Sequence, residues 1–107
     1  DRVKDMIKRS GENISAGEVE SVLLDHPAVF ECAVVGIPDP VKDESIVAVA
    51  VINPGIEVTA DELIGHCAAR LAKFRVPQQV IFRNSLPKTS VGKIQKHLLR
   101  QELIDNQ

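Results

Sequence analysis

The feature that most constrains the fold is the segment Ser45–Ile52, which reads SIVAVAVI and is apolar at nearly every position. Such a run of β-branched residues and alanines predicts a strand. A strand without a polar face is buried on both sides, or is covered by helices on one side and carries small Ala side chains on the other. Val29–Ile37, VFECAVVGI, predicts a second strand that is broken by the prolines at 38 and 40. We therefore expect a small sheet with helices packed against it.

Two helices are predicted to begin at the same signal, a Ser or Thr followed three residues later by Glu. In this capping box each side chain satisfies a free backbone N–H of the other residue. Ser15 and Glu18 predict one helix, which ends at Pro27. Thr59 and Glu62 predict another. Flanking apolar pairs predict a hydrophobic staple at each start: Ile14 with Val19, and Val58 with Leu63.

The remaining predicted elements are shorter. Residues 1–13 are polar and predict a short hairpin or an ordered loop, with its return near residues 10–12. Gln79–Phe82 predicts a third strand, and Ile94–Ile104 predicts a final amphipathic helix. The fold class is α+β: a small, mainly three-stranded sheet packed with helices and preceded by a short N-terminal hairpin.

Length and composition fit a single domain. The chain has 107 residues, of which 44% are hydrophobic and 26% charged. It contains no apolar run of about 18 residues and no signal peptide at its start, so we expect a cytoplasmic protein without a membrane span. Because Met6 is the sole methionine, we expect a fragment of a larger protein or a processed product. Cys32 and Cys67 lie in apolar patterns and are interpreted as buried free thiols.

Charge is unevenly distributed. From Arg70 to Arg100 there are eight Lys or Arg residues and no Asp or Glu, whereas the other 76 residues hold fifteen acidic and five basic side chains. A basic final third indicates either a solvated face or a polyanionic partner, such as nucleic acid or a small phosphorylated ligand. With three Phe, no Tyr and no Trp, the chain has few aromatic platforms for stacked bases. We expect no nucleic-acid partner.

The common catalytic motifs are missing. Gly92-Lys93 suggests a Walker phosphate loop, but that motif needs glycine where Pro87 stands and Ser or Thr where Ile94 stands. No G-x-S-x-G nucleophile elbow occurs, and no His, Cys, Asp or Glu residues have convincing metal-ligand spacing, so no metal site is predicted. The histidines are interpreted as surface or helix-capping side chains: His26, His66 and His97.

Lone basic residues on predicted loops remain as candidates: Lys4, Lys8, Lys88 and Lys93. Each on its own is interpreted as a solvated side chain. Together they indicate a domain that has no nucleophile of its own and serves a partner that holds the substrate. In such a domain a lysine stabilises negative charge that develops during the reaction.

Five segments, in the right order and covering essentially the whole chain, carry a resemblance to a known family. They are DRVKDMIKRSGENIS, GEVESVLLDHPAV, VVGIPDPVKDE, LAKFRVPQQV and LPKTSVGKIQKHLLR. The series resembles the C-terminal domain of the adenylate-forming enzymes, which include acyl-CoA synthetases, peptide-synthetase adenylation domains and beetle luciferases. MIKRSGENIS and AKFRVP are most similar to acid–CoA ligases, with the crotonobetaine/carnitine–CoA ligase type as the nearest.

The resemblance implies an activity in two half-reactions. A carboxylate attacks the α-phosphate of ATP to give an acyl-adenylate and pyrophosphate, and the thiol of coenzyme A then displaces AMP. A large N-terminal domain, absent from this sequence, binds the acid and ATP with Mg²⁺, and the small C-terminal lid domain closes over it in two orientations. Residues 1–107 would be this lid domain, its partner would be its own N-terminal domain, and alone it would be inactive.

The resemblance also implies roles for single residues. Lys93 matches the lysine that contacts the carboxylate and the α-phosphate during adenylation, and Gly92 lets its loop approach closely. Lys4 matches the hinge about which the domain rotates. Arg2 matches an arginine near the ribose and phosphate of the nucleotide.

Other positions match the groups used in the second half-reaction. The loop that enters the site for thioester formation corresponds to Lys8, Ser10, Gly11 and Glu12. Phe74 and Arg75 correspond to the segment that contacts the nucleotide of CoA, by stacking and by phosphate pairing. Val76 and Gln78 stand where relatives can carry basic residues, and Asp1 stands where many members have Gly.

Two alternatives remain open. The same domain could serve an adenylating enzyme whose acceptor is a carrier-protein thiol or an oxygen. The chain could also be a non-catalytic basic module that binds nucleic acid or an acidic protein. The acyl substrate and the oligomeric state are not encoded in these residues.

Overall fold

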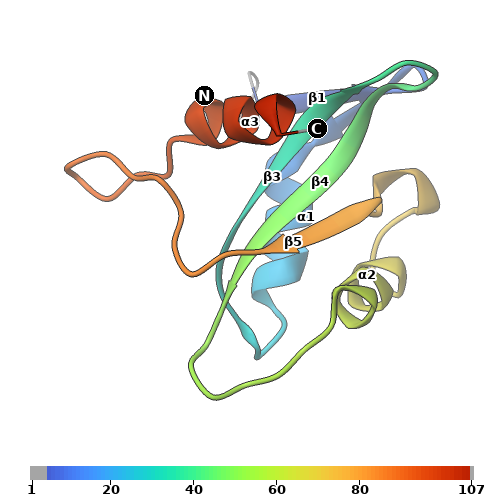
Figure 1. Cartoon of the computed structure of the whole chain (residues 1–107). Coiled ribbons are helices and arrows are strands. Elements are labelled where there is room, and N and C mark those ends of the chain that lie inside the picture. The colour runs from blue at the N-terminus through green and yellow to red at the C-terminus, as the bar shows by residue number, and fades with distance from the viewer. Residues whose placement is uncertain (1–4, 107) are drawn as a thin grey trace.

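The computed structural model describes residues 5–106, which form one sheet with helices on both of its faces (Figure 1). The strands are β1 (Met6–Arg9), β2 (Glu12–Ser15), β3 (Val29–Asp39), β4 (Asp43–Ile52) and β5 (Gln79–Phe82). The helices are α1 (Ala16–Leu24), α2 (Ala60–Ala68) and α3 (Lys96–Asp105), with a 3₁₀ turn, η2 (Lys73–Arg75), before β5. The predicted α+β class is confirmed.

The centre of the sheet has three strands. β3 and β4 form a long antiparallel hairpin, in register from Val29 opposite Ile52 to Asp39 opposite Asp43. β5 adds to the other side of β4 in parallel. The β1–β2 hairpin extends the same sheet, because Arg9 pairs with Asp43 at the start of β4. The sequence predicts a hairpin that precedes the sheet, and in the structure this hairpin forms two of the strands of the sheet itself.

Both faces of the central strands are buried, as the apolar sequence of β4 predicts. Ile46, Ala48 and Ala50 belong to the cluster that includes the buried residues of α1 and α2. The alternate residues Val47, Val49 and Val51 belong to clusters beneath α3. The alternation follows from the two-residue period of a strand. The small alanines face the side that two helices cover.

The two predicted helix caps differ in the structure. The capping box at Thr59 is complete: the Glu62 N–H donates to Thr59 Oγ1 (3.1 Å) and the Thr59 N–H donates to Glu62 Oε1 (3.0 Å). At Ser15 the hydroxyl accepts from the Glu18 N–H (3.3 Å), but the return bond is not formed. The Glu18 carboxylate instead binds Arg75 (3.0 Å), so the prediction of a reciprocal box was wrong there.

Two boundaries also differ from the prediction. β3 continues through Pro38, which pairs with Glu44. Proline is tolerated because β3 lies at the end of the strand order, where its outer N–H groups need no partner strand. The last helix begins at Lys96 rather than Ile94, because Ile94 forms a β-bridge with Lys88.

The two cysteines are free and buried, as predicted. Burial raises the pKa of the Cys32 thiol to about 12, and the nearby Glu20 carboxylate adds to the effect. Burial likewise raises the pKa of Cys67 to about 11. Both thiols are therefore protonated at neutral pH and unsuited to nucleophilic chemistry. No helix within residues 5–106 has the length and apolar character needed to cross a membrane.

Candidate functional site

Most cations of the basic final third are neutralised inside the domain. Five of the eight form ion pairs with carboxylates of the acidic remainder of the chain. The pairs are Arg75–Glu18 (3.0 Å), Arg83–Glu102 (2.7 Å), Lys88–Glu31 (2.8 Å), Lys96–Glu20 (2.5 Å) and Arg100–Glu44 (3.3 Å). The uneven charge along the sequence is thus largely balanced by folding. It does not form one continuous basic face for a polyanion.

Lys93 lies at the end of a small hairpin between β5 and α3. Lys88 and Ile94 pair across it, and the Thr89 N–H donates to the Lys93 carbonyl (2.8 Å). In the turn, the Gly92 N–H donates to the Thr89 carbonyl (2.9 Å) and the Lys93 N–H to Thr89 Oγ1 (3.1 Å). Gly92 has φ +87°, a left-handed conformation that favours glycine. The loop therefore has its own hydrogen-bonded structure.

The Lys93 ammonium is the cation of this loop that the fold leaves available. Lys88 and Lys96, on either side of it, bind the carboxylates of Glu31 and Glu20. Lys93 is exposed and forms no ion pair with any residue between 5 and 106. Figure 1 shows the loop, in orange, projecting beyond the sheet and the helices. A cation held in this way can reach an anion bound outside the domain.

The β1–β2 turn presents the residues that the resemblance assigns to the second half-reaction. Ser10 (φ 52°) and Gly11 (φ 84°) form the tight turn, and no atom lies within 4 Å of where a Gly11 Cβ would be. Lys8, Ser10, Gly11 and Glu12 are all exposed. The turn is fixed from behind, because the Ser10 N–H donates to the Lys42 carbonyl (3.2 Å). It presents an open, polar edge.

Phe74 and Arg75 lie on η2, beside the start of α1. The Arg75 guanidinium lies 5.2 Å from the centre of the Phe74 ring and binds Glu18. Arg75 Nε is buried and has no hydrogen-bond partner among the described residues. Phe74 is 41% exposed, so its ring remains accessible for stacking.

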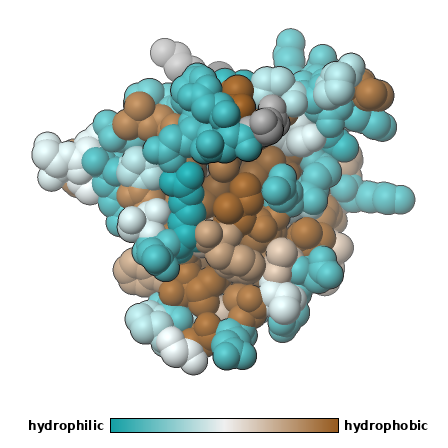
Figure 2. All heavy atoms as spheres, viewed as in Figure 1, coloured by the Kyte–Doolittle hydropathy of each residue, from teal (hydrophilic) through white to brown (hydrophobic). Residues whose placement is uncertain are grey.

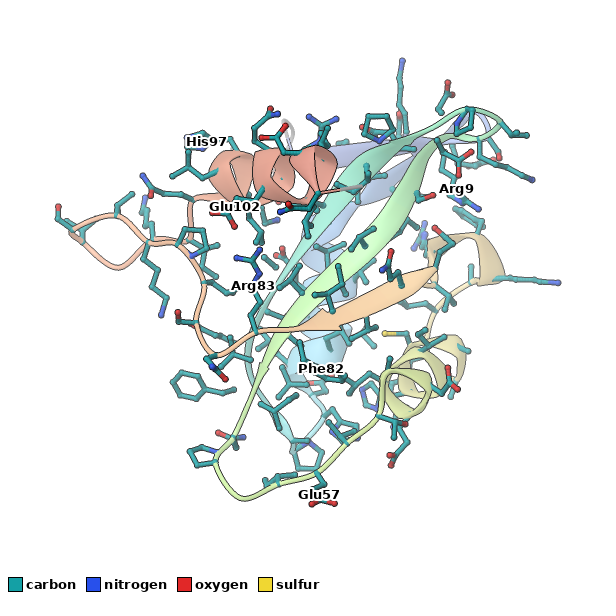
Figure 3. All side chains as sticks on the ribbon, in the orientation of Figure 1. Arg9, Glu57, Phe82, Arg83, His97 and Glu102 are labelled. Atoms are coloured by element: carbon teal, nitrogen blue, oxygen red, sulfur yellow. The ribbon has the colours of Figure 1, made fainter. Side chains whose placement is uncertain are left out.

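The candidate residues that the structure describes do not form one site. In Figure 1 the Lys93 loop lies at one side of the molecule, and the β1–β2 turn and the segment before β5 lie at the other. Figure 3 shows the same separation, with Arg9 of β1 on the side opposite His97 of α3. Arg2 and Lys4 lie outside the described residues. The domain therefore offers two distinct ends to whatever it contacts.

Among residues 5–106 the histidines and carboxylates form no further site. His66 Nε2 is 2.7 Å from the Val22 carbonyl, and His26 Nδ1 accepts from the Ala28 N–H (3.1 Å). The two rings pack edge to face with centroids 5.0 Å apart, so both are structural, whereas His97 is exposed. Between residues 5 and 106 no group of three His, Cys, Asp or Glu side chains could hold a metal ion.

Exposed apolar side chains surround shallow hollows in the face of Figure 2. One hollow, about 630 Å³, lies where β4 and β5 end and includes Ile56 and Phe82, which are 44% and 40% exposed. Its charged members are Glu57 and Arg83, and the latter is already paired with Glu102. The hollow thus has mixed apolar and polar walls, and no cluster of charged side chains of one sign lines it.

Lys96 has a structural role that the sequence motifs do not indicate. It is the first residue of α3, where the helix dipole disfavours a cation. That position was the available signal that its ammonium has carboxylate partners. Its partners are Asp5 and Glu20.

Comparison with known proteins identifies the family. Residues 18–93 match the pattern of the AMP-binding enzyme C-terminal domain. The chain belongs to this family. Among curated relatives, this AMP-binding C-terminal domain is 48% identical over 103 residues to the probable CoA ligase CCL11 of Humulus lupulus. It is 41% identical over 99 residues to the crotonobetaine/carnitine–CoA ligase of Proteus mirabilis. These alignments cover 94% and 92% of the chain and 18% and 19% of the relatives.

Solved structures agree. The AMP-binding C-terminal domain superposes on the Brucella canis acyl-CoA synthetase with a TM-score of 0.92 and 44% identity, covering 99% of this chain and 20% of that one. For the amide bond synthetase McbA of Marinactinospora thermotolerans the TM-score is 0.88 and the sequence identity 35%. The superposition covers 95% of this chain and 21% of that one. The family resemblance and the fold predicted from sequence are confirmed. The chain spans about one-fifth of the length of these relatives.

Proposed function

We propose that this domain is the mobile C-terminal lid of an ATP-dependent, AMP-forming carboxylic acid–CoA ligase. The observation that carries the proposal is the environment of Lys93, whose ammonium is free at a projecting hairpin while Lys88 and Lys96 beside it are bound to carboxylates. The acid–CoA ligases among the relatives support the same reaction class.

In the first half-reaction Lys93 would contact the attacking carboxylate and the α-phosphate of ATP. The two reactants are both anions, so a cation between them reduces their repulsion and holds them in line. We place the acid, ATP and its Mg²⁺ in the larger part of the enzyme, which the aligned relatives contain beyond this domain.

In the second half-reaction the opposite end of the domain would face the substrate. The open turn with Lys8, Ser10, Gly11 and Glu12 would line the path of the CoA thiol. Phe74 would contact the CoA nucleotide by stacking, and Arg75 would pair with a phosphate in exchange for its contact with Glu18. Because these groups and Lys93 lie at different ends, one orientation cannot use both, which supports rotation between the two steps.

The hinge for this rotation would lie at Lys4, with Arg2 near the bound nucleotide. Both residues are outside the described range, but the first described residue supports the placement. The Ala16 N–H donates to the Asp5 carbonyl (3.1 Å), and the Asp5 carboxylate pairs with Lys96. Since Asp5 is held by backbone and side chain, the domain can turn as one body only upstream of it.

The test is Lys93→Ala in the full-length enzyme that contains this domain. Acyl-adenylate formation, followed by pyrophosphate exchange, should slow roughly 100- to 1,000-fold, the usual effect of losing one key electrostatic contact. Transfer from supplied acyl-adenylate to CoA should stay within about threefold, because Lys93 is remote from the thioester end.

The matched control is Lys73→Ala, which removes another exposed lysine that forms no ion pair with a described residue. Its adenylation rate should equal that of the wild type. Equal losses of both half-reactions in Lys93→Ala would contradict the assigned role.

A second candidate is an adenylating enzyme with another acceptor, which the likeness to the amide bond synthetase McbA supports. An acceptor panel of CoA, a carrier protein and amines, with one acyl-adenylate supplied, separates the two. A basic module for nucleic acid has less support, because internal ion pairs occupy five of the eight cations in question.

A further inference from the structure

Lys96 connects three separate parts of the domain. It begins α3, three residues after Lys93, and its side chain is only 25% exposed. Its ammonium forms ion pairs with Asp5, at the start of the described chain, and with Glu20 of α1 (2.5 Å). The contact with Asp5 joins residues 91 positions apart in the sequence.

Both partners of Lys96 are held by another hydrogen bond, Glu20 through its carboxylate and Asp5 through its backbone. Asp5 is held through its backbone carbonyl, which accepts from the Ala16 N–H. The Glu20 carboxylate also accepts from the Val34 N–H of β3 (2.8 Å). An ion pair between preorganised groups fixes geometry, whereas a pair of free surface side chains does not.

We propose that Lys96 is a positioning residue that fixes the Lys93 loop relative to the point where the chain enters the domain. The inference rests on the proposed function, in which Lys93 acts in adenylation and the hinge immediately precedes Asp5. Rotation about the hinge then carries the loop with it as one body. Without this link, the same rotation would deliver Lys93 less accurately.

The loop has a second support that does not reach the hinge. Lys88 binds Glu31 at the start of β3 (2.8 Å), and this pair holds the other side of the loop against the sheet. Among the ion pairs of the described residues, only the one formed by Lys96 connects the first turn of α3, next to the loop, with Asp5. The thioester end has other supports, because the Lys8 N–H donates to Glu44 (2.9 Å).

The decisive variant is Lys96→Met in the full-length enzyme, which keeps the length of the side chain and removes its charge. Adenylation should slow about 10- to 100-fold, because a displacement of about 1 Å in a reacting group has an effect of this size. Thioester formation from supplied acyl-adenylate should stay within about twofold. Lys96→Arg, which keeps the charge, should restore most of the adenylation rate.

The matched control is Glu102→Gln, which breaks the Arg83–Glu102 pair on the same helix without touching Asp5 or the loop. It should lower the melting temperature slightly and leave the ratio of the two half-reactions unchanged. If Glu102→Gln changed that ratio as much as Lys96→Met, general loosening of α3 would explain the effect and the proposal would be wrong.

A double-mutant cycle tests the link to Asp5, and the Asp5→Asn variant alone keeps the proposal testable if Lys96→Met folds poorly. Asp5→Asn should slow adenylation selectively, and adding it to Lys96→Met should cause little further loss, because both remove the same pair. Fully multiplicative effects would overturn the proposal. Lys93→Ala separates the two ideas: a selective loss there with none in Lys96→Met or Asp5→Asn rejects only the positioning role.

Discussion

Three lysines within nine residues show how the fold differentiates side chains of one type. Lys88, Lys93 and Lys96 are alike in the sequence, yet two of them bind carboxylates and one is free. The difference arises from partners far along the chain, Glu31 and Glu20. No local pattern encodes these partners. The sequence motif singled out Lys93 as a candidate. The structure adds that Lys88 and Lys96 differ from it, because their ammonium groups bind carboxylates.

A single carboxylate at the β3–β4 turn, that of Asp39, makes the stability of the fold depend on pH. The Val41 and Lys42 N–H groups donate to Asp39, and the Ser45 hydroxyl does as well. These hydrogen bonds, the one from Val41 first, lower the pKa of Asp39 from 3.8 to about 2. Hydrogen bonds to the charged form stabilise the fold while Asp39 is ionised.

The lowered pKa fixes the sign of the effect. The contribution of Asp39 is complete about one pH unit or more above the unfolded-state pKa of 3.8, where the group is ionised in both states, and it is lost as the pH falls through about 2. We expect the melting temperature of the wild type to exceed that of Asp39→Ala at pH 6, and the difference to shrink between pH 4 and 2. A difference that is constant over this range would contradict the assignment.

At the scale of elements, local sequence signals predicted most helices and strands. Contacts between distant segments explain where the observed boundaries and pairings differ from that prediction. β4 and the Thr59 box were predictable because period and capping are local properties. The parallel addition of β5 and the contact of the hairpin with β4 depend on pairing between distant segments. The shortened start of α3 follows from the Lys88–Ile94 bridge. Ion pairs that join distant residues left no signal except the cation at the start of α3.

The two helix caps allow a comparison within one molecule. Thr59→Ala removes a hydroxyl from a complete capping box and should lower the free energy of unfolding by about 1 kcal/mol. Ser15→Ala removes one bond of 3.3 Å while the Glu18–Arg75 pair remains, so its effect should be smaller. Urea unfolding of the 107-residue chain measures both. The reverse order would show that the pairing of Ser15 in β2 matters more than its cap.

At the scale of the whole molecule, the domain is about 39 Å long and has candidate groups at both ends. Between them lies a sheet with a core on each face, so the ends keep a fixed distance and orientation. A rigid body of this kind can exchange one end for the other by turning about a single point. That property suits a two-step reaction better than a domain with one composite site.

The same architecture predicts the behaviour of the domain alone. The 107-residue chain should unfold cooperatively, since both faces of its sheet are covered by its own helices. It should form no acyl-CoA from ATP, CoA and any carboxylic acid, because the proposed acid and ATP sites lie in the rest of the enzyme. Circular dichroism on heating and a thioester assay measure the two properties. Detectable acyl-CoA would contradict the lid assignment.

The buried thiols have a practical consequence for testing the proposed rotation. With pKa values raised to about 12 and 11, Cys32 and Cys67 should react very slowly with maleimides at neutral pH. Val91, at the tip of the Lys93 loop, is 80% exposed. A dye attached after Val91→Cys would therefore label the moving loop selectively within this domain. Energy transfer to a second dye on the larger part of the enzyme would then test whether the domain turns during catalysis, as proposed.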